Sequence, residues 1–155
     1  MKLQQNTRLA LYSLLEFAAD PKRQIPAAEI AQKYEVSSHH LAKVLAELSR
    51  VGMVKSVRGA GGGYRFVGNA RRLTLMDVIS RFEDLLPSES AQDQETPVGQ
   101  ALASVLSEID EIAKASMSSI TLATMLRIVE RQQAGAVLAA VSQVKTDRST
   151  AGVSG

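Results

Sequence analysis

The feature that most constrains how this 155-residue chain folds is residues 36–66, VSSHHLAKVLAELSRVGMVKSVRGAGGGYRF. The first half has apolar residues at the i, i+3, i+4 and i+7 spacing of a helix that buries one face, namely Leu41, Val44, Leu45 and Leu48. Ser37 or Ser38 can cap the start of this helix, and Gly52 suits its end. The stretch therefore predicts an amphipathic helix with a defined start and stop.

A glycine-rich hairpin is predicted directly after that helix. Residues 53–58 and 64–67 have the pattern of two short strands, and residues 59–63, GAGGG, join them. Glycine adopts the positive φ angles of tight turns and lets the backbone come close to a partner. The order of these elements, helix and then a basic hairpin, is that of a winged helix-turn-helix.

Two more helices are predicted before this stretch. Asn6 or Thr7 can cap a helix over residues 8–19, which Asp20-Pro21 then ends. Pro26 suits the first turn of a short second helix. Together with the hairpin, these helices predict a mainly α fold, a winged helix-turn-helix with a two-stranded wing.

The outward face of the helix that starts near Ser38 is expected to read DNA. In helix-turn-helix proteins, the N-terminal residues of the recognition helix contact base edges. The candidate contacts are small or polar side chains, namely Ser38, His39, His40, Ala42 and Lys43. Taken alone, the same pattern also suits an ordinary solvent-exposed helix with a cap and one lysine.

The wing is expected to supply a second set of contacts. A glycine-rich tip can enter a narrow minor groove, whose negative potential attracts arginine. The candidate wing residues are Arg58, Gly59, Gly61, Gly62, Tyr64 and Arg65. A plain hairpin with arginines in water is the alternative, but a helix of this pattern joined to such a wing favours DNA binding.

Charge is distributed unevenly along the chain. Residues 1–72 hold 12 Lys and Arg against 5 Asp and Glu, a net charge of +7, whereas residues 73–155 hold 6 against 11, a net charge of −5. A basic half fits a polyanion such as double-stranded DNA, because binding releases counterions. Chance asymmetry of a solvated surface would give the same numbers.

The second half of the chain predicts a loop and further helices. Thr74 can cap a short helix, and residues 84–97, DLLPSESAQDQETP, are acidic and bounded by proline. Residues 98–116 have a long helical pattern, and helix resumes near 120–131 after Ser118 or Ser119. We expect Gly135 to break that helix, with one last helical piece over 136–144 and a frayed tail.

The absence of cysteine excludes several classes of site. The chain has no cysteine and only two histidines, so disulfides, thiolate zinc sites and cysteine nucleophiles are ruled out. Adjacent helical residues such as His39 and His40 point about 100° apart, so we expect no metal site there. The run GAGGGY lacks the phosphate-loop pattern. No pairing of nucleophile and base stands out, so we expect neither an enzyme nor a cofactor.

Localisation is expected to be cytoplasmic. The best candidate for a signal peptide, residues 9–19, is flanked by Arg8 and interrupted by Glu16, and no apolar run approaches the about 20 residues of a membrane helix. We therefore expect no membrane partner.

The chain resembles the BadM/Rrf-type family of winged-helix transcriptional regulators. That family includes the iron–sulfur-cluster biogenesis regulator and the nitric-oxide-sensing repressor of bacteria. The resemblance covers about residues 1–132. It is carried by MKLQQNTRLAL at the start, by the whole of residues 25–66, by LTLMDVISRFED, and by SSITLATMLRIV near Ile120. Its most specific part is RGAGGGY after a helix-turn-helix.

The resemblance implies a homodimer on a near-palindromic operator, with the long helix as the dimerisation helix. Independently, a wide apolar face on an appended helix needs a partner, although that face can also fold back on its own domain. The expected interface residues are Val98, Leu102, Val105, Leu106, Ile109 and Ile112. The predicted division is therefore a DNA-binding domain at 1–83, an acidic loop at 84–97, dimerisation helices at 98–144 and a flexible tail at 145–155.

The chain departs from the family pattern at the sensor. Cluster-binding members carry three cysteines in the region that corresponds to about residues 85–98, and some use an acidic ligand where this chain has Arg8. The expected function is a sequence-specific regulator, a repressor, whose signal is not a cysteine-held cluster but a small-molecule or protein effector acting at the 84–97 loop. The chain is either a cysteine-free branch or a cysteine-substituted variant. An architectural or protein-interaction module that senses nothing is the alternative.

Overall fold

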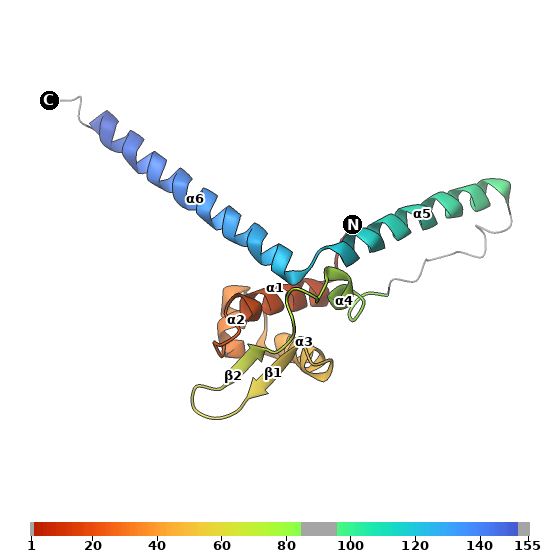
Figure 1. Cartoon of the computed structure of the whole chain (residues 1–155), viewed down its shortest axis with the longest axis horizontal. Coiled ribbons are helices and arrows are strands. Elements are labelled where there is room, and N and C mark those ends of the chain that lie inside the picture. The colour runs from red at the N-terminus through yellow and green to blue at the C-terminus, as the bar shows by residue number, and fades with distance from the viewer. Residues whose placement is uncertain (1, 85–95, 152–155) are drawn as a thin grey trace.

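Helix α1, Gln5–Ala19, lies at the centre of the domain, and the other elements of the winged-helix part pack around it (Figure 1). The computed structural model describes residues 2–84 and 96–151, with the side-chain surroundings of 144–151 excepted. Within these ranges α2 spans Ala27–Lys33, α3 Ser38–Arg50 and α4 Leu75–Ile79. The core draws on all of these helices, and its fully buried large side chains include Leu14, Phe17, Ile30, Leu45 and Ile79.

The two strands form the predicted hairpin. Strand β1, Val54–Val57, pairs antiparallel with β2, Gly63–Phe66, in a register that places Val54 opposite Phe66. The segment before α2 joins this sheet, because Ile25 exchanges both backbone hydrogen bonds with Tyr64, at 2.9 and 2.8 Å. The hairpin is therefore fastened to the helical core along its second strand.

The start of α1 is capped from a distant part of the chain. The N-cap residue Gln4 makes no side-chain cap; instead Glu83 Oε1 accepts hydrogen bonds from the Gln4 backbone N–H at 2.7 Å and from the Thr7 hydroxyl at 2.6 Å. The prediction that Asn6 or Thr7 caps this helix is wrong, because the helix already begins at Gln5. A tertiary contact to the end of the α4 region replaces the local cap.

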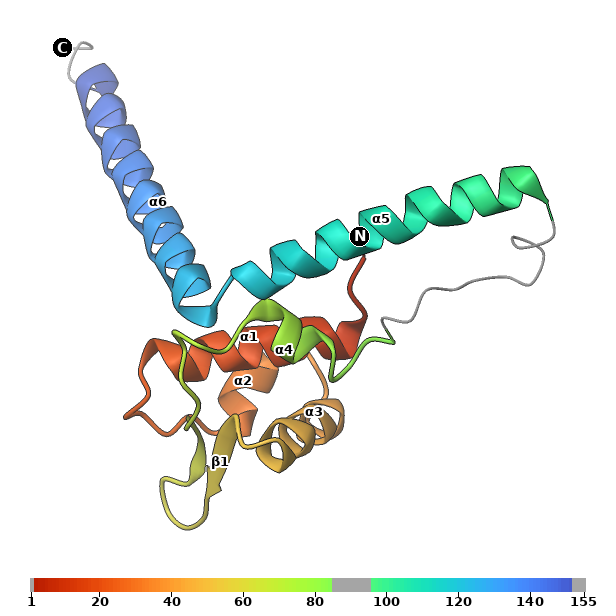
Figure 2. The ribbon, with the colours of Figure 1, turned by 45° about the vertical axis from the view of Figure 1, so that its right-hand side comes forward.

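Two long helices leave the domain as diverging arms (Figure 2). Helix α5 spans Pro97–Ser119 and α6 spans Leu122–Ala151. The base of both arms belongs to the winged-helix core, since Met117 and Leu122 are buried in it. None of the described helices is long and apolar enough to cross a membrane.

Backbone hydrogen bonds fix the break between α5 and α6. Leu75 N–H donates to the Ile120 carbonyl at 2.8 Å, and Leu122 N–H donates to the Leu73 carbonyl at 2.8 Å. Residues committed to this bridge cannot also form a helix, so α5 runs to Ser119 and helix does not restart at Ser118 or Ser119 as predicted. The bridge ties the arms to the segment that leads into α4.

The expected break at Gly135 is wrong, because α6 continues through it to Ala151. A single glycine in a helix interior costs about 1 kcal/mol, which good helix formers on either side offset. The tail expected from residue 145 is helical up to Ala151, and residues 152–155 lie outside the described part. Most of the acidic 84–97 loop, residues 85–95, also lies outside it.

We predict opposite effects for two glycine-to-alanine substitutions. A Cβ at Gly63 would meet the Ile25 carbonyl oxygen at 2.5 Å, whereas a Cβ at Gly135 meets nothing within 4 Å. Gly63→Ala should lower the free energy of unfolding by about 1–3 kcal/mol, because backbone must move. Gly135→Ala should raise it by up to about 1 kcal/mol. Urea unfolding at one fixed protein concentration measures both. Two changes of the same sign would contradict this account.

The distant cap of α1 leads to a second prediction. Glu83→Ala should lower the free energy of unfolding by about 1–2 kcal/mol, because it leaves the Gln4 N–H and the buried Thr7 hydroxyl without their acceptor. Glu83→Gln should lose less, since its amide oxygen still accepts a hydrogen bond. Asp110→Asn on the exposed face of α5 is the control, with a change within about 0.5 kcal/mol. Equal stability of Glu83→Ala and the wild type would show that this contact does not hold α1.

Candidate nucleic-acid interface

Helix α3 presents a defined outer face because its inner face is buried completely. Leu41, Val44, Leu45 and Leu48 are each 0–2% exposed. The helix starts at the N-cap Ser37, whose Oγ accepts a hydrogen bond from the His40 backbone N–H at 3.1 Å. The opposite face is exposed and brings together Ser38, His39, Ala42, Lys43 and Ala46. Four of the five recognition-helix residues named from the sequence, all but His40, thus lie on this outer face.

His40 differs from its neighbour. Its side chain is half-buried, and its Nε2 atom is shielded from solvent without a hydrogen-bond partner among the described residues. The position precedes Val44 by four residues and so lies about 40° from it around the helix, at the edge of the buried row. His40 therefore lies at the border of the domain core, and the DNA contact expected for it stays a prediction.

Arg50 lies on the same outer face and was missed by the sequence analysis. It follows Lys43 by seven residues, or about two helical turns, which is the signal that identifies it. Its guanidinium binds Glu47 through two contacts, Nη2 to Oε1 at 2.5 Å and Nε to Oε2 at 2.8 Å. This hydrogen bonding lowers the pKa of the Glu47 carboxyl. Arg50 is thereby held partly neutralised, and Lys43 remains as an exposed cation that makes no ion pair with a described residue.

The hairpin register places two cations directly opposite each other on the exposed face of the wing. Lys55 pairs with Arg65, and both side chains are exposed. Like charges at opposed positions of an antiparallel pair are destabilising. An anionic partner such as a phosphate backbone relieves that repulsion. Arg65 was predicted from the sequence, whereas Lys55 was not, because its position opposite Arg65 depends on the strand register.

The wing tip carries Arg58 and the glycine turn. Arg58 follows β1 directly and is exposed. Gly59 and Gly61 have φ angles of 106° and 75°, and the Gly62 N–H donates to the Gly59 carbonyl at 2.9 Å. The positive φ angles of these glycines form a tight turn. The tip of this turn is small, so the neighbouring Arg58 stays accessible.

Tyr64 is placed with the core and not with the wing tip. Side chains alternate along a strand, so Tyr64 shares a face with Phe66, which is 6% exposed. Its ring lies 6.2 Å from that of Phe17. Tyr64 thus anchors β2 to α1, and the DNA contact expected at this half-buried side chain stays a prediction.

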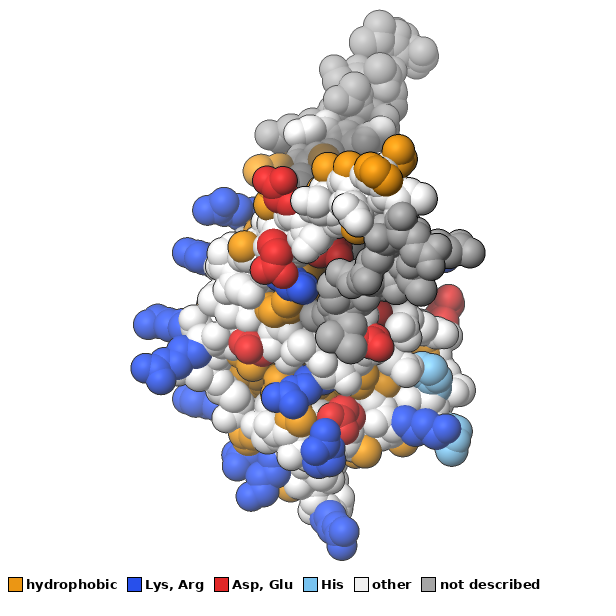
Figure 3. All heavy atoms as spheres, turned by 90° about the vertical axis from the view of Figure 1, so that its right-hand side faces the viewer, with side chains coloured by type: hydrophobic (Ala, Val, Ile, Leu, Met, Phe, Trp, Pro, Cys, Tyr) orange, Lys and Arg blue, Asp and Glu red, His pale blue; other side chains and the backbone are white. Residues whose placement is uncertain are grey.

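Positive charge gathers over the winged-helix part of the surface. Figure 3 shows Lys and Arg side chains along one side and at the lower end, where Figure 1 places the hairpin and α3. A patch of hydrophobic side chains lies in the upper part of this view, below the grey atoms, and others are scattered over the face. The two surfaces differ in the partners that they suit, a polyanion for the first and an apolar surface for the second.

The apolar stripe of α5 is exposed along its whole length. The six residues expected at a dimer interface are 52–79% exposed, namely Val98, Leu102, Val105, Leu106, Ile109 and Ile112. Large apolar side chains at this level of exposure are unusual in such a continuous row. The fold-back alternative is not what the structure shows, because these side chains do not pack on their own domain.

Comparison with known proteins agrees with this geometry. The family Rrf2, described as iron-dependent transcriptional regulators, matches residues 3–128. The chain belongs to the Rrf2 family. A curated relative from Rhodopseudomonas palustris with the name BadM, an HTH-type transcriptional regulator, is 45% identical over 134 residues, 86% of each chain. The HTH-type transcriptional regulator NsrR of Shouchella clausii is 30% identical over 97 residues, 62% of this chain and 65% of its own.

Solved structures of Rrf2-type regulators have the same fold. CymR of B. subtilis, titled the global cysteine regulator, has a TM-score of 0.72 at 28% identity, covering 83% of this chain and 98% of its own. IscR of T. potens has a TM-score of 0.70 at 26% identity, covering 86% and 91%. This Rrf2 protein is accordingly a DNA-binding transcriptional regulator with a winged-helix fold and long C-terminal helices.

The residues of this chain do not fit an iron–sulfur cluster held by cysteine. The sequence contains no cysteine, and within the described ranges no three His, Asp or Glu side chains come together as a metal site. The resemblance implies an acidic ligand at the position of Arg8 in some members, and a guanidinium cannot take that role. Cysteine ligation of an iron–sulfur cluster is therefore excluded for this chain by its sequence.

Proposed function

We propose that this Rrf2 protein is a homodimeric repressor that binds a near-palindromic operator. The observation that carries the proposal is the wing register, which holds Lys55 against Arg65 on an exposed face next to the outer face of α3. Two cations held opposite each other repel, and a bound anion lowers that repulsion. The exposed small residues of α3 supply a surface of the right size for a major groove.

The proposed contacts divide by chemistry. Lys43, Lys55 and Arg65 are exposed cations that suit phosphates, and these set affinity and its salt dependence. Ser38 and His39 can donate to or accept from base edges, and Ala42 leaves room for close approach. Arg58, at the tip, suits a narrow minor groove. Specificity then comes from α3 and the tip, while the wing strands position the protein.

The homodimer is supported by the exposed stripe of α5. Each member of the stripe is more than half exposed, so the helix needs a partner that covers it. A second copy offers the same stripe, and two-fold symmetry presents two recognition helices to two half-sites. Half-sites about 34 Å apart, one turn of DNA, fit such a dimer. A bound dimer that occludes a promoter represses without any further domain.

Selection of bound duplexes from a random DNA pool tests operator recognition and supplies the target for variants. Against the selected operator, Arg58→Ala should weaken binding by about 1–3 kcal/mol and relax the preference at its own base step, because a directed contact is lost. Lys43→Ala should weaken binding to all duplexes and make the decrease of log affinity with log salt concentration less steep. Arg131→Ala, an exposed arginine on α6, is the matched control with unchanged affinity. Fluorescence anisotropy at several salt concentrations measures these effects.

Failure of that selection would favour the architectural alternative. Binding of every duplex with one affinity, and an equal loss for Arg58→Ala on all of them, would show that the protein reads charge alone. Recovery of one inverted repeat would exclude that alternative.

A charge placed in the α5 stripe should break the dimer. Ile109→Lys should convert the protein to a monomer in sedimentation equilibrium and weaken operator binding by at least tenfold, because one recognition helix alone remains. Ser107→Lys adds the same charge on the opposite face of the same exposed helix and should leave the dimer intact. A dimer that survives Ile109→Lys but not Ser107→Lys would place the interface on the other face.

A further inference from the structure

A groove lies between the winged-helix domain and the base of α6, and it is separate from the DNA-facing surface. Its volume is about 380 Å³, within the range of sites for small molecules. One wall comes from α1 and α2 and the other from α6. The apolar part of the lining consists of Tyr12, Leu15, Tyr34, Met125, Leu126 and Val129.

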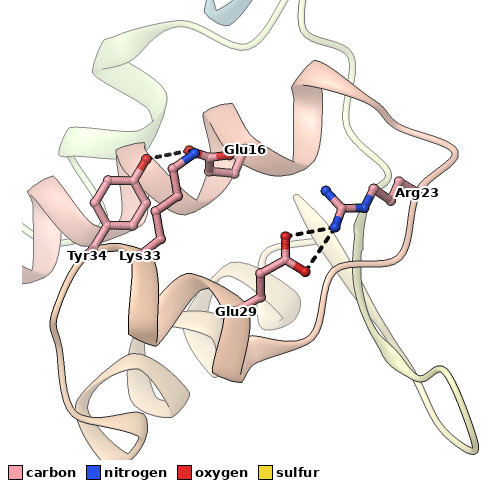
Figure 4. Close-up of polar contacts among 5 residues, drawn as sticks. All are labelled: Glu16, Arg23, Glu29, Lys33 and Tyr34. Carbon is pink, nitrogen blue, oxygen red and sulfur yellow. Dashed lines mark hydrogen bonds and ion pairs between the residues drawn. The ribbon is translucent and has the colours of Figure 1, made fainter.

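Two tyrosines form an aromatic surface in this groove. The rings of Tyr12 and Tyr34 are stacked, with centroids 4.9 Å apart and planes at 21°. The Tyr34 hydroxyl donates a hydrogen bond to Glu16 Oε1 at 2.5 Å, which fixes the ring in place (Figure 4). Rigid aromatic faces attract both apolar groups and cations, and each ring already has one cation over it, Arg8 over Tyr12 and Lys33 over Tyr34, both 5.8 Å from the ring centroid. The rings therefore suit the apolar body of a ligand.

Glu16 and Lys33 neutralise each other at one end of the groove. Lys33 Nζ lies 2.5 Å from Glu16 Oε1. Burial raises the pKa of the Glu16 carboxyl, but the hydrogen bonds from Lys33 and Tyr34 outweigh it and bring the pKa below its ordinary value of 4.5. The carboxylate is therefore charged at neutral pH. Two further cations lie nearby. Arg23 is bound to Glu29 through both carboxylate oxygens, at 2.8 and 2.9 Å. Arg8 lies outside the lining, where its guanidinium donates to the Tyr12 hydroxyl at 3.1 Å.

Glu130 on the α6 wall leaves the groove with an excess negative charge. Its carboxylate makes no ion pair with any described residue. The lining thus holds two carboxylates, Glu16 and Glu130, and one ammonium group, Lys33. An anion entering the groove would have to displace Glu16 from Lys33, whereas a cation supplies the missing charge.

We propose that this groove is an effector site for a small apolar cation, an ammonium group on an aromatic or aliphatic body, and that its occupancy changes operator affinity. The body packs on the Tyr12 and Tyr34 rings and on Met125, and the ammonium group pairs with Glu130. The part about operator affinity rests on the proposed function.

The position of the groove explains how a bound molecule could change the placement of the DNA-binding surface. Its first wall includes α2, and only the turn at residues 34–37 separates α2 from α3. Its second wall is α6, whose start is bridged to Leu73. A molecule held between the two walls fixes the angle of α6 to the domain. The junction that α6 shares with α5 carries this constraint to the proposed dimerisation helix, whose angle sets the distance between recognition helices. Coupling of two sites is reciprocal, so DNA must also change the affinity for the cation.

Binding is tested first without DNA, by titration calorimetry on the full chain. The three probes share one body and differ in charge: phenethylammonium, 2-phenylethanol and phenylacetate. The cation should bind at least tenfold more tightly than the alcohol and the anion. Equal binding of all three, tighter binding of phenylacetate, or no binding of phenethylammonium would overturn the proposal.

Two variants and one control locate the site. Glu130→Gln should remove the preference for phenethylammonium over 2-phenylethanol while the fold, followed by circular dichroism, is unchanged. Ala19→Trp, at the exposed end of α1 in the lining, should block both probes. Glu108→Gln on α5 removes the same charge outside the groove and should change nothing. Retention of the preference in Glu130→Gln would overturn the assignment of this residue.

The coupling is tested with the selected operator. Saturating phenethylammonium should change operator affinity by about 5- to 150-fold, the usual range of allosteric coupling, and Glu130→Gln should abolish that change. Cation binding with unchanged operator affinity would overturn the effector role. Phenethylammonium that dissociates the dimer in sedimentation would mean that a second copy occupies the groove, which also overturns the proposal. Failure to find any operator affects the proposed function alone, because the calorimetry uses no DNA.

Discussion

The burial of one apolar row on α3 is the constraint on which the rest of the structure depends. Leu41, Val44, Leu45 and Leu48 are sealed against α1 at 0–2% exposure, so the helix cannot rotate about its axis without exposing them. The outer face, with His39 and Lys43, is therefore presented to solvent in one orientation. The recognition surface follows from the packing of the opposite face.

The wing holds positive charges on its exposed face that do not contribute to the stability of the fold. Tyr64 and Phe66 face inward and anchor β2, and the alternation of the strand then forces Arg65 outward, opposite Lys55. On α3, by contrast, Arg50 is neutralised by Glu47 within its own helix. Unpaired cations thus lie where DNA is expected, and a paired cation lies at the far end of the same face.

Backbone hydrogen bonds from Leu73 and Leu75 to residues 120–122 fix the junction of the two long helices to the domain. They anchor the junction of α5 and α6 beside the short α4, whose own start is fixed by a capping box between Thr74 and Asp77. From this fixed point α5 carries its exposed apolar stripe outward, and α6 forms one wall of the groove that contains Glu130. The proposed dimer interface, the winged-helix domain and the proposed effector site are connected at one structural junction.

The sequence by itself determined the elements whose signals are local. The period of α3, the Ser37 cap, the glycine turn and the long pattern of α5 are set by neighbours within about seven residues, so each was predicted. Tertiary structure decided the rest. Glu83 caps α1 from a distant position, the bridge at Ile120 ends α5, Gly135 does not break α6, and Tyr64 packs beside Phe17. These outcomes depend on groups far apart in the chain, whose hydrogen bonds and packing override local propensity once the core has formed.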